Sequence, residues 1–243
     1  MNSTEFPAPV ALVTGATSGI GRAVARALAA DGFSVIVHGR DAARGAVVAD
    51  EIVAGGGHAR FVAADLTDAA DVERLAVEAA DVDVLVNNAG FSWFGPTADL
   101  TPATFDAMFA ANVRSAYFLV AAIAPLMAKR GAGSIINVGS MAGQIGLAGG
   151  AAYSATKAAL ASLTRSWAAE FSPQGVRVNT VAPGPAYTDG AVPGRTAALG
   201  ATTLLGRAAE AGEVADVVAF LASPKSGYVT GAVIAADGGR TAV

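Results

Sequence analysis

The chain of 243 residues contains no cysteine and only two histidines, His38 and His58. The absence of cysteine excludes disulfide bonds, a thiol nucleophile and any metal centre ligated by cysteine. With two histidines, a histidine-rich site is not expected either, and we predict no bound metal. A Ser-His-Asp hydrolase would need one of them, yet both lie in the N-terminal third, whereas α/β-hydrolases place the catalytic histidine last in chain order.

Charged residues are also scarce, at 15% of the chain against 53% hydrophobic residues, and the net charge is −4. This composition indicates a folded protein with a sizeable core. The acidic balance argues against nucleic acid or an anionic membrane as a partner. The longest apolar run, residues 115–128, is too short to span a bilayer and is interpreted as a buried core helix. Residues 1–9 do not resemble a secretory signal, so we expect a soluble, cytoplasmic protein.

Short runs rich in Val, Ile and Leu alternate with segments of helical periodicity along the whole chain. Such runs are typical of strands buried on both faces. The pattern predicts a Rossmann-type, doubly wound parallel β-sheet with helices on both faces. We expect a single domain over residues 1–243. The least regular segment, 184–211, is expected to be functional, with residues 185–207 forming a lid over the substrate. Strands are expected at 10–14, 33–38, 59–64, 82–87, 133–140, 176–183 and 231–237, and helices at 20–32, 41–57, 67–80, 101–130, 151–172 and 212–223.

A glycine-rich turn, TGATSGIG at residues 14–21, separates the first strand from the first helix. Gly15 permits the tight turn, Gly19 lets the backbone approach a pyrophosphate, and Gly21 allows close packing of helix on strand. The N-terminus of the helix would face the phosphates. A glycine-rich turn alone is weak evidence, but its place between strand and helix favours dinucleotide binding over an ordinary loop.

Tyr153 and Lys157 lie four residues apart in the helical stretch AAYSATKAAL, residues 151–160. Positions i and i+4 share one face of a helix. A tyrosine ordinarily has a pKa of about 10, and a neighbouring ammonium group favours the phenolate and lowers that pKa. The two residues are therefore a candidate proton-transfer pair. The pattern alone also fits a partly buried tyrosine beside a solvated lysine.

The order of these motifs resembles that of the short-chain dehydrogenase/reductases, in their short single-domain branch. The resemblance covers most of the chain, and only residues 1–9 and 189–211 lack a recognisable pattern. The motifs that follow the glycine-rich turn are DL (65–66), NNAG (87–90), Asn112, Ser140, YSATK (153–157) and PGPAYT (183–188).

The resemblance implies the catalytic residues Asn112, Ser140, Tyr153 and Lys157. Tyr153 would protonate the carbonyl oxygen during reduction, and Ser140 would hydrogen-bond the substrate oxygen. Lys157 would also hold the nicotinamide ribose, and Asn112 a water that relays protons towards Lys157. The implied cofactor contacts are Gly15, Thr17, Ser18, Gly19, Ile20, Gly21, Arg40, Asp65, Leu66, Asn88, Ala89, Gly90, Tyr153, Lys157, Pro183, Gly184 and Thr188.

The end of the second strand, VIVHGRD, indicates which dinucleotide is bound. NAD-dependent enzymes place an acid there for the ribose 2′-hydroxyl. In this chain Gly39 takes the place of the family's acid, and Arg40 follows. Arg40 could bind the 2′-phosphate of NADP through paired, charge-assisted hydrogen bonds. Asp41 could instead bind the ribose 2′-hydroxyl of NAD, but we interpret it as a helix cap. NADP is therefore the expected cofactor.

The expected rim of the substrate site is apolar and aromatic, which suggests a ketone with an apolar body. No arginine or lysine falls among the rim residues, so an anionic group near the reacting carbon is not expected. Phe91 and Phe94 belong to this rim beside the predicted substrate contacts Trp93, Ser140, Met141, Gln144, Leu147, Tyr153 and Tyr187.

Three other functions remain open. A 3-oxoacyl-carrier-protein reductase would need a basic patch for its acidic partner; Lys129 and Arg130 could supply part of one, but Gln174 stands where those reductases usually have a basic residue. A non-catalytic dinucleotide sensor is the alternative from another class, although such proteins usually lose the tyrosine or the lysine. A sugar-nucleotide epimerase or dehydratase would need a longer C-terminal domain.

Helices 101–130 and 151–172 carry more apolar and small residues than one core face needs, including Trp167 and Phe171. Large apolar surfaces mark interfaces. By resemblance, paired copies of these helices form a closed, symmetric homotetramer. The alternative is that both helices are simply well buried in the monomer.

Overall fold

The fold of residues 8–243 is described by a computed structural model, and it is organised around one seven-stranded sheet in the order β3-β2-β1-β4-β5-β6-β9. Every neighbouring pair is parallel. The predicted doubly wound parallel sheet is therefore confirmed. The strands of the sheet are β1 (Val10–Val13), β2 (Ser34–Gly39), β3 (His58–Ala63), β4 (Val84–Asn87), β5 (Gly133–Val138), β6 (Val176–Pro183) and β9 (Val233–Ala236).

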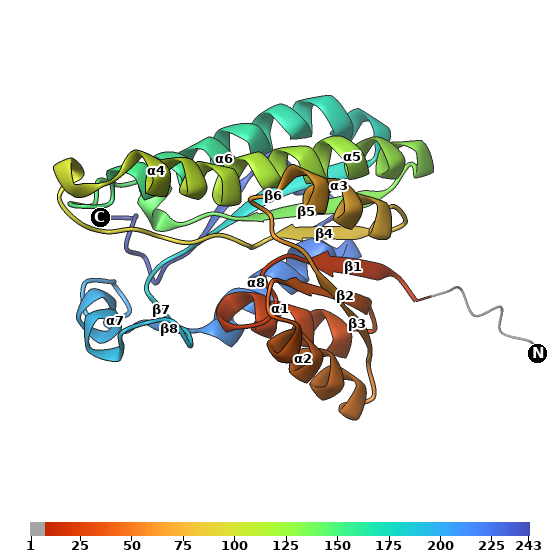
Figure 1. Cartoon of the computed structure of the whole chain (residues 1–243), viewed down its shortest axis with the longest axis horizontal. Coiled ribbons are helices and arrows are strands. Elements are labelled where there is room, and N and C mark those ends of the chain that lie inside the picture. The colour runs from red at the N-terminus through yellow and green to blue at the C-terminus, as the bar shows by residue number, and fades with distance from the viewer. Residues whose placement is uncertain (1–7) are drawn as a thin grey trace, which may run out of the picture.

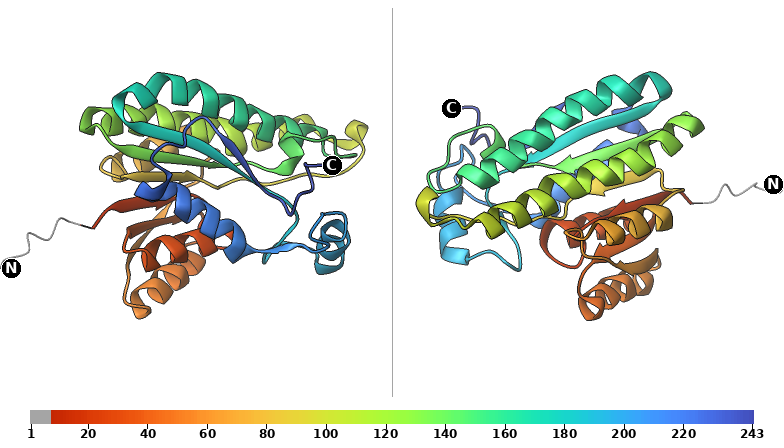
Figure 2. Two further views of the ribbon diagram at one scale, coloured as in Figure 1. Left: turned by 180° about the vertical axis from the view of Figure 1, so that it is seen from behind. Right: turned by 45° about the horizontal axis from the view of Figure 1, so that its top comes forward.

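Helices cover both faces of the sheet and make a three-layer structure (Figures 1 and 2). One core cluster of buried apolar residues lies between the sheet and helices α1, α2 and α8, and a second lies on the opposite face under α3, α5 and α6. This two-sided burial explains why the strands read as continuous apolar runs. The helices are α1 (Gly19–Ala30), α2 (Ala42–Ala54), α3 (Ala69–Glu78), α4 (Pro102–Phe109), α5 (Ser115–Arg130), α6 (Ala151–Phe171) and α8 (Ala211–Ala222).

Local signals in the sequence place several helix ends. Asp41 accepts a hydrogen bond from the backbone N–H of Arg44 and begins α2, as expected from its interpretation as a cap. Thr101 caps α4 in the same way, with Pro102 in the first turn. Gly131 ends α5 in the left-handed conformation, with φ 74°.

The helix expected over residues 101–130 is continuous from Pro102 to Arg130, and its length and composition would allow it to cross a membrane. Its inward side is instead buried against the sheet, through residues such as Leu119, Ile123 and Met127. The structure differs from a regular helix at Ala110–Arg114, which forms one π-helical turn between α4 and α5. Such turns are frequent at functional sites, and this one contains Asn112.

The segment expected to be irregular, 184–211, contains short regular elements. β7 (Ala186–Tyr187) pairs in parallel with β8 (Ala209–Glu210), and α7 (Pro193–Gly200) lies between them. These elements form a small lobe at one end of the sheet, to the left in Figure 1. Pro193 in the first turn of α7 supplies a start signal, but eight residues are too few to show a clear period.

Candidate active site

The carboxyl ends of the strands meet at one edge of the sheet, and the predicted motifs follow those ends. The chain runs outward through β1, β2 and β3, and then returns to build β4, β5 and β6 on the other side of β1. The gap between the ends of β1 and β4 is therefore the switch point at which open α/β sheets bind ligands. Thr14 and Asn88 lie at this point, and the backbone N–H of Asn88 donates to Thr14 Oγ1 at 3.0 Å.

Asn88 holds the glycine-rich turn in place. Its Nδ2 donates to Thr14 O at 2.8 Å and to Gly15 O at 3.1 Å. A Cβ atom on Gly21 would lie 2.3 Å from Gly15 O, and one on Gly15 would lie 2.8 Å from Ala89 Cα. Glycine is required at both positions because the backbone of the turn, α1 and the end of β4 approach closely.

The N-terminus of α1 has no cap from its own N-cap residue, since the side chain of Ser18 makes no capping hydrogen bond. The caps of α2 and α3, by contrast, are made by Asp41 and Asp68. At α1 the backbone N–H of Gly19 donates to Asp189 Oδ2 at 3.2 Å. A carboxylate from a distant segment thus lies where a helix N-terminus favours an anion, and the residues of this turn fit a pyrophosphate.

His38 joins the glycine-rich turn to the end of β3, a role the sequence did not indicate. Its Nδ1 accepts from the backbone N–H of Gly15 at 3.2 Å, and its Nε2 lies 3.1 Å from Ala64 O. These partners require a neutral ring with the proton on Nε2, because Gly15 donates and Ala64 accepts. Burial lowers the pKa of His38 to about 4, so the ring stays neutral well below pH 6.

We predict that His38→Gln flattens the dependence of stability on pH between 6.5 and 4. The folded-state pKa of about 4 lies below the ordinary histidine value of 6.5, so the folded protein binds fewer protons in this window. The contribution of His38 to the free energy of unfolding is fully present above pH 6.5. It falls by about 3 kcal/mol as the pH falls towards 4. Urea unfolding at several pH values measures the slope, and parallel curves for the two proteins would contradict the prediction.

The ends of β2 and β3 bring Arg40 and Asp65 together. Arg40 is exposed, and its positive charge contributes to keeping the pKa of Asp65 low, after the larger effect of the Thr67 backbone N–H that donates to this carboxylate. Leu66 is 6% exposed and packs in the core, so only a small part of it faces the cleft.

Tyr153 and Lys157 lie together as predicted, with Lys157 Nζ 5.7 Å from the centroid of the Tyr153 ring. The predicted direction of the tyrosine's shift is wrong in this structure. Burial raises the pKa of Tyr153, while a hydrogen bond with Ser140 opposes the rise. Burial also lowers the pKa of Lys157 to about 8, and its ammonium group donates to Val138 O at 2.8 Å. Desolvation therefore outweighs the attraction between the two groups.

Ser140 and Asn112 are held beside this pair. Ser140 Oγ accepts from the backbone N–H of Ala142 at 3.1 Å, which fixes the serine at the end of β5. Both ends of the Asn112 amide are engaged: Oδ1 accepts from Phe91 N at 2.9 Å, and Nδ2 donates to Phe91 O and to Thr156 Oγ1. The amide of Asn112 therefore clamps the chain after NNAG onto α6.

The remaining predicted cofactor contacts lie around the turn. Thr188 approaches the turn closely, because a Cβ on Gly19 would lie 3.1 Å from Thr188 Cβ. Gly184 lies against the backbone of Asp237. Gly90 faces Asn112, whose Oδ1 would lie 2.6 Å from an added Cβ. Thr17, Ile20 and Pro183 complete the set along the turn, α1 and the end of β6.

At the predicted rim of the substrate site, the structure brings aromatic rings together with a cation. Phe94 lies 5.7 Å from Tyr153 between ring centroids, and Arg195 Cζ lies 4.8 Å from the centroid of the Phe94 ring. The expectation of no arginine or lysine at the rim is therefore wrong, because α7 brings Arg195 to it from a segment without a family pattern. Of the other predicted contacts, Met141 is buried, Gln144 is exposed, and Trp93, Leu147 and Tyr187 are half-buried.

A doubly wound sheet with a glycine-rich turn at its switch point, and a tyrosine–lysine pair beside it, defines an oxidoreductase of the Rossmann class. The family model described as short chain dehydrogenase matches residues 9–197. The chain belongs to the short-chain dehydrogenase/reductase family.

Curated relatives match over nearly their whole length. The chain is 40% identical to the cis-4-hydroxycyclohexanecarboxylate dehydrogenase of Sinomonas cyclohexanicum, with 98% of each protein covered. It is 38% identical to the 3-oxoacyl-[acyl-carrier-protein] reductase of Synechocystis sp., with 97% of this chain and 98% of the relative covered. These relatives have the same fold family and different substrates.

Solved structures agree with the fold. A short chain dehydrogenase/reductase family protein is 50% identical, with a TM-score of 0.90 and coverage of 97% of this chain and 98% of that one. The angucycline C-6 ketoreductase LanV, solved with bound NADP, is 35% identical, with a TM-score of 0.91 and coverage of 97% and 96%.

Proposed function

We propose that the protein is an NADP(H)-dependent oxidoreductase that interconverts an apolar ketone and a secondary alcohol. The observation that carries this proposal is the placement of Tyr153 and Lys157 beside Ser140. The N-terminus of α1, where the Asp189 carboxylate accepts from Gly19 N, supports an anion site for the cofactor. When bound, the cofactor supplies or accepts the hydride. Every other step depends on side chains of this chain.

Tyr153 is the proposed general acid and base. In reduction its hydroxyl gives a proton to the carbonyl oxygen, and in oxidation the phenolate takes the proton from the alcohol. Ser140, whose hydroxyl reaches Tyr153, hydrogen-bonds the same substrate oxygen. Lys157 is buried, and in the part of the chain that the structure describes its ammonium group donates only to Val138 O, which leaves its other N–H groups for the ribose of the nicotinamide.

Asn112 has a proposed positioning role besides the expected relay of protons through a water. Its side chain is bonded to Phe91 and Thr156, so it holds the chain after β4 against α6. The phosphates of the cofactor would lie on Gly15 to Gly21, with Asn88, Ala89 and Gly90 beside the ring system.

NADP is favoured over NAD because of Arg40. It is exposed at the end of β2, among the described residues it forms no ion pair, and no acid occupies position 39. A guanidinium group there can bind a 2′-phosphate through two parallel hydrogen bonds. The solved ketoreductase with bound NADP supports the same choice.

We predict that Arg40→Ala raises the Michaelis constant for NADPH about 10- to 100-fold and changes that for NADH less than about threefold, since only a charge-assisted bond to the phosphate is lost. To gain NADH use, Gly39→Asp should be combined with Thr17→Ala. A Cβ at position 39 would lie 2.4 Å from Thr17 Cγ2, and truncation leaves Thr17 Cβ at 3.4 Å. Steady-state kinetics with both cofactors measure this, and a wild type that prefers NADH would refute it.

Free ketones are favoured as substrates over carrier-protein thioesters. Arg130, one of two residues proposed for carrier docking, already donates to Val82 O and Ala80 O. Reduction of 3-oxoacyl thioesters on a carrier protein remains the second candidate function, because a reductase of that kind is 38% identical to this chain. Consumption of NADPH with a panel of cyclic and linear ketones tests the main proposal. If NADPH binds normally but is not consumed, the non-catalytic sensor is favoured instead. If carrier-protein thioesters are reduced at a much higher rate than free ketones, the second candidate is favoured.

Residues 185–207 are proposed to act as the lid of a single-domain enzyme. β7, α7 and β8 lie at the carboxyl end of the sheet, and two lid residues, Asp189 and Arg195, contact the cofactor turn and the substrate rim. Leu204 and Leu205 are 62% and 67% exposed, which is consistent with apolar surface that closes over a ligand. Shortening 190–204 should change both turnover and the Michaelis constant.

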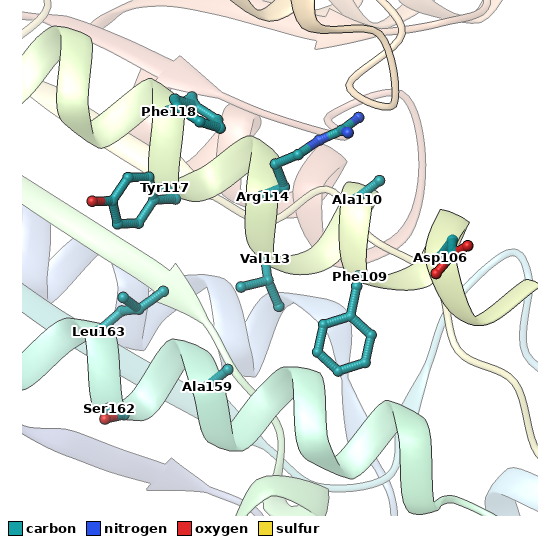
Figure 3. A pocket seen from close by; sticks show the side chains of 10 residues that line it. All are labelled: Asp106, Phe109, Ala110, Val113, Arg114, Tyr117, Phe118, Ala159, Ser162 and Leu163. Atoms are coloured by element: carbon teal, nitrogen blue, oxygen red, sulfur yellow. The ribbon is translucent and has the colours of Figure 1, made fainter. Parts of the chain in front are cut away.

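A homotetramer is proposed from the groove between α4–α5 and α6. Figure 3 shows Phe109 and Val113 pointing towards α6, with Tyr117 and Leu163 continuing the apolar surface. Tyr117 and Phe118 remain 46% and 54% exposed. A second copy of the same helices would cover this surface in a closed symmetric pair. Light scattering should give four subunits, and a monomer at micromolar concentration would refute this.

The proposed location is the cytoplasm, since the long apolar helix is packed on the sheet.

A further inference from the structure

Arg195 brings a positive charge to the rim of the proposed substrate site. It lies on α7 and is exposed, and its Cζ lies 4.8 Å from the centroid of the Phe94 ring. The same ring lies 5.7 Å from that of Tyr153. One aromatic ring therefore links the guanidinium group to the proposed proton donor.

Phe94 is held against the beginning of α6, so the position of its ring beside Tyr153 is set by fixed parts of the protein. A Cβ on Gly150 would lie 2.9 Å from Phe94 Cε1, which shows how closely the backbone approaches the ring. The next residue, Gly95, donates its backbone N–H to Gly149 O at 3.0 Å. With Arg195 on this ring, a group that Arg195 binds would lie on the substrate side of Tyr153.

Arg195 has no hydrogen-bond partner among residues 8–243. Five arginines of that range form ion pairs and three others donate to backbone carbonyls; Arg195 is one of five arginines that do neither, and among these its contact with Phe94 places it at the substrate rim. The acid of the same lobe, Asp189, is engaged by Gly19. A cation–π contact at an exposed site is weak and leaves all five N–H donors available.

We infer, on the basis of the proposed function, that Arg195 is a specificity-determining residue that binds a carboxylate on the substrate. The favoured substrates are then oxo acids, or the corresponding hydroxy acids, with an apolar body about as broad as one ring between the carbonyl carbon and the carboxylate. Phe94 would pack on the apolar body. Arginine suits this role because its planar group binds a carboxylate through two parallel hydrogen bonds.

The test compares 4-oxocyclohexanecarboxylate and 6-oxoheptanoate with their methyl esters, as substrates for the full chain with NADPH. The wild type should have a kcat/KM at least tenfold higher for each acid than for its ester. Arg195→Gln should remove this preference and leave the rate with the esters within about threefold. Arg195→Lys should keep part of the preference, because the charge remains without the planar fork. Arg26→Gln, which removes an exposed charge on α1, is the matched control and should keep the full preference.

Two contrary results have different meanings. If acids and esters are reduced equally well by the wild type, or if Arg195→Gln lowers both rates alike, Arg195 acts only by packing on Phe94, and the inference is wrong while the proposed function stands. If neither acids nor esters are reduced, and a wider ketone panel also fails, the proposed function fails and this inference fails with it.

Discussion

Tyr153→Phe should lower kcat about 1000-fold in both directions of the reaction, while NADPH binds within about threefold of its normal affinity. The substitution removes the transferable proton and nothing else in contact with the substrate oxygen. The ring of residue 153 still packs on Phe94, and Ser140 still accepts from Ala142 N. The unfolding free energy should change by less than about 1 kcal/mol, since a net hydrogen bond contributes about that much.

The measurements are NADPH consumption under saturating substrate and a fluorescence titration with NADPH. Ser140→Ala, which removes the second hydroxyl at the oxygen, is a useful comparison and should lower kcat by a smaller factor. A Tyr153→Phe enzyme that keeps more than about a tenth of its activity would show that another group transfers the proton.

Lys157→Met should abolish turnover yet make the protein more stable at pH 7. Lys157 is 6% exposed, and among residues 8–243 its ammonium group has one acceptor, Val138 O. Burial lowers the pKa of Lys157 from 10.5 to about 8, which corresponds to a cost of about 3 kcal/mol for keeping it charged in the folded protein at neutral pH. The substitution removes this cost but also loses the hydrogen bond to Val138 O. We therefore expect a net gain of about 1 kcal/mol in the free energy of unfolding. Activity should fall at least 100-fold, because the contact with the ribose and the charge beside Tyr153 are both lost.

The size of this gain in stability depends on pH. Below pH 8 the folded lysine is charged and its full penalty is present. Between pH 8 and 10.5 the unfolded chain binds more protons than the folded one, so the wild type gains stability as the pH rises and the advantage of Lys157→Met shrinks. Thermal unfolding at pH 7 and pH 9.5 measures this, with the exposed Lys225→Met as a control. A variant that is less stable than the wild type at pH 7 would contradict the account.

The order of strands and helices could be predicted because each strand is buried on both faces and therefore appears as a continuous apolar run. The motifs at the strand ends could be placed for a related reason: parallel strands bring their carboxyl ends to one edge, so residues as distant as Thr14 and Asn88 meet there. Glycine at positions 15 and 21 follows from the same close approach of turn and helix.

Properties that depend on tertiary surroundings could not be predicted in this way. The pKa of Tyr153 rises because its site is buried, and a spacing of four residues says nothing about burial. His38 looks like a strand residue, and only the fold shows that Gly15 and Ala64 are its partners. Arg195 lies on a helix of eight residues inside a segment without periodicity, so its approach to Phe94 has no signal in the sequence.

The π-helical turn at Ala110–Arg114 makes the exact number of residues in this helix part of the site. A π turn contains one residue more than an α turn, and each residue rotates a helix by about 100°. Deleting one residue there would convert the π turn into an α turn, which keeps Pro102–Phe109 in phase with α5 but removes the wider turn that carries Asn112. Asn112 could then no longer reach both Phe91 and Thr156 while Leu119 stays in the core. Substitutions along this helix should therefore be tolerated far more often than insertions or deletions of a single residue.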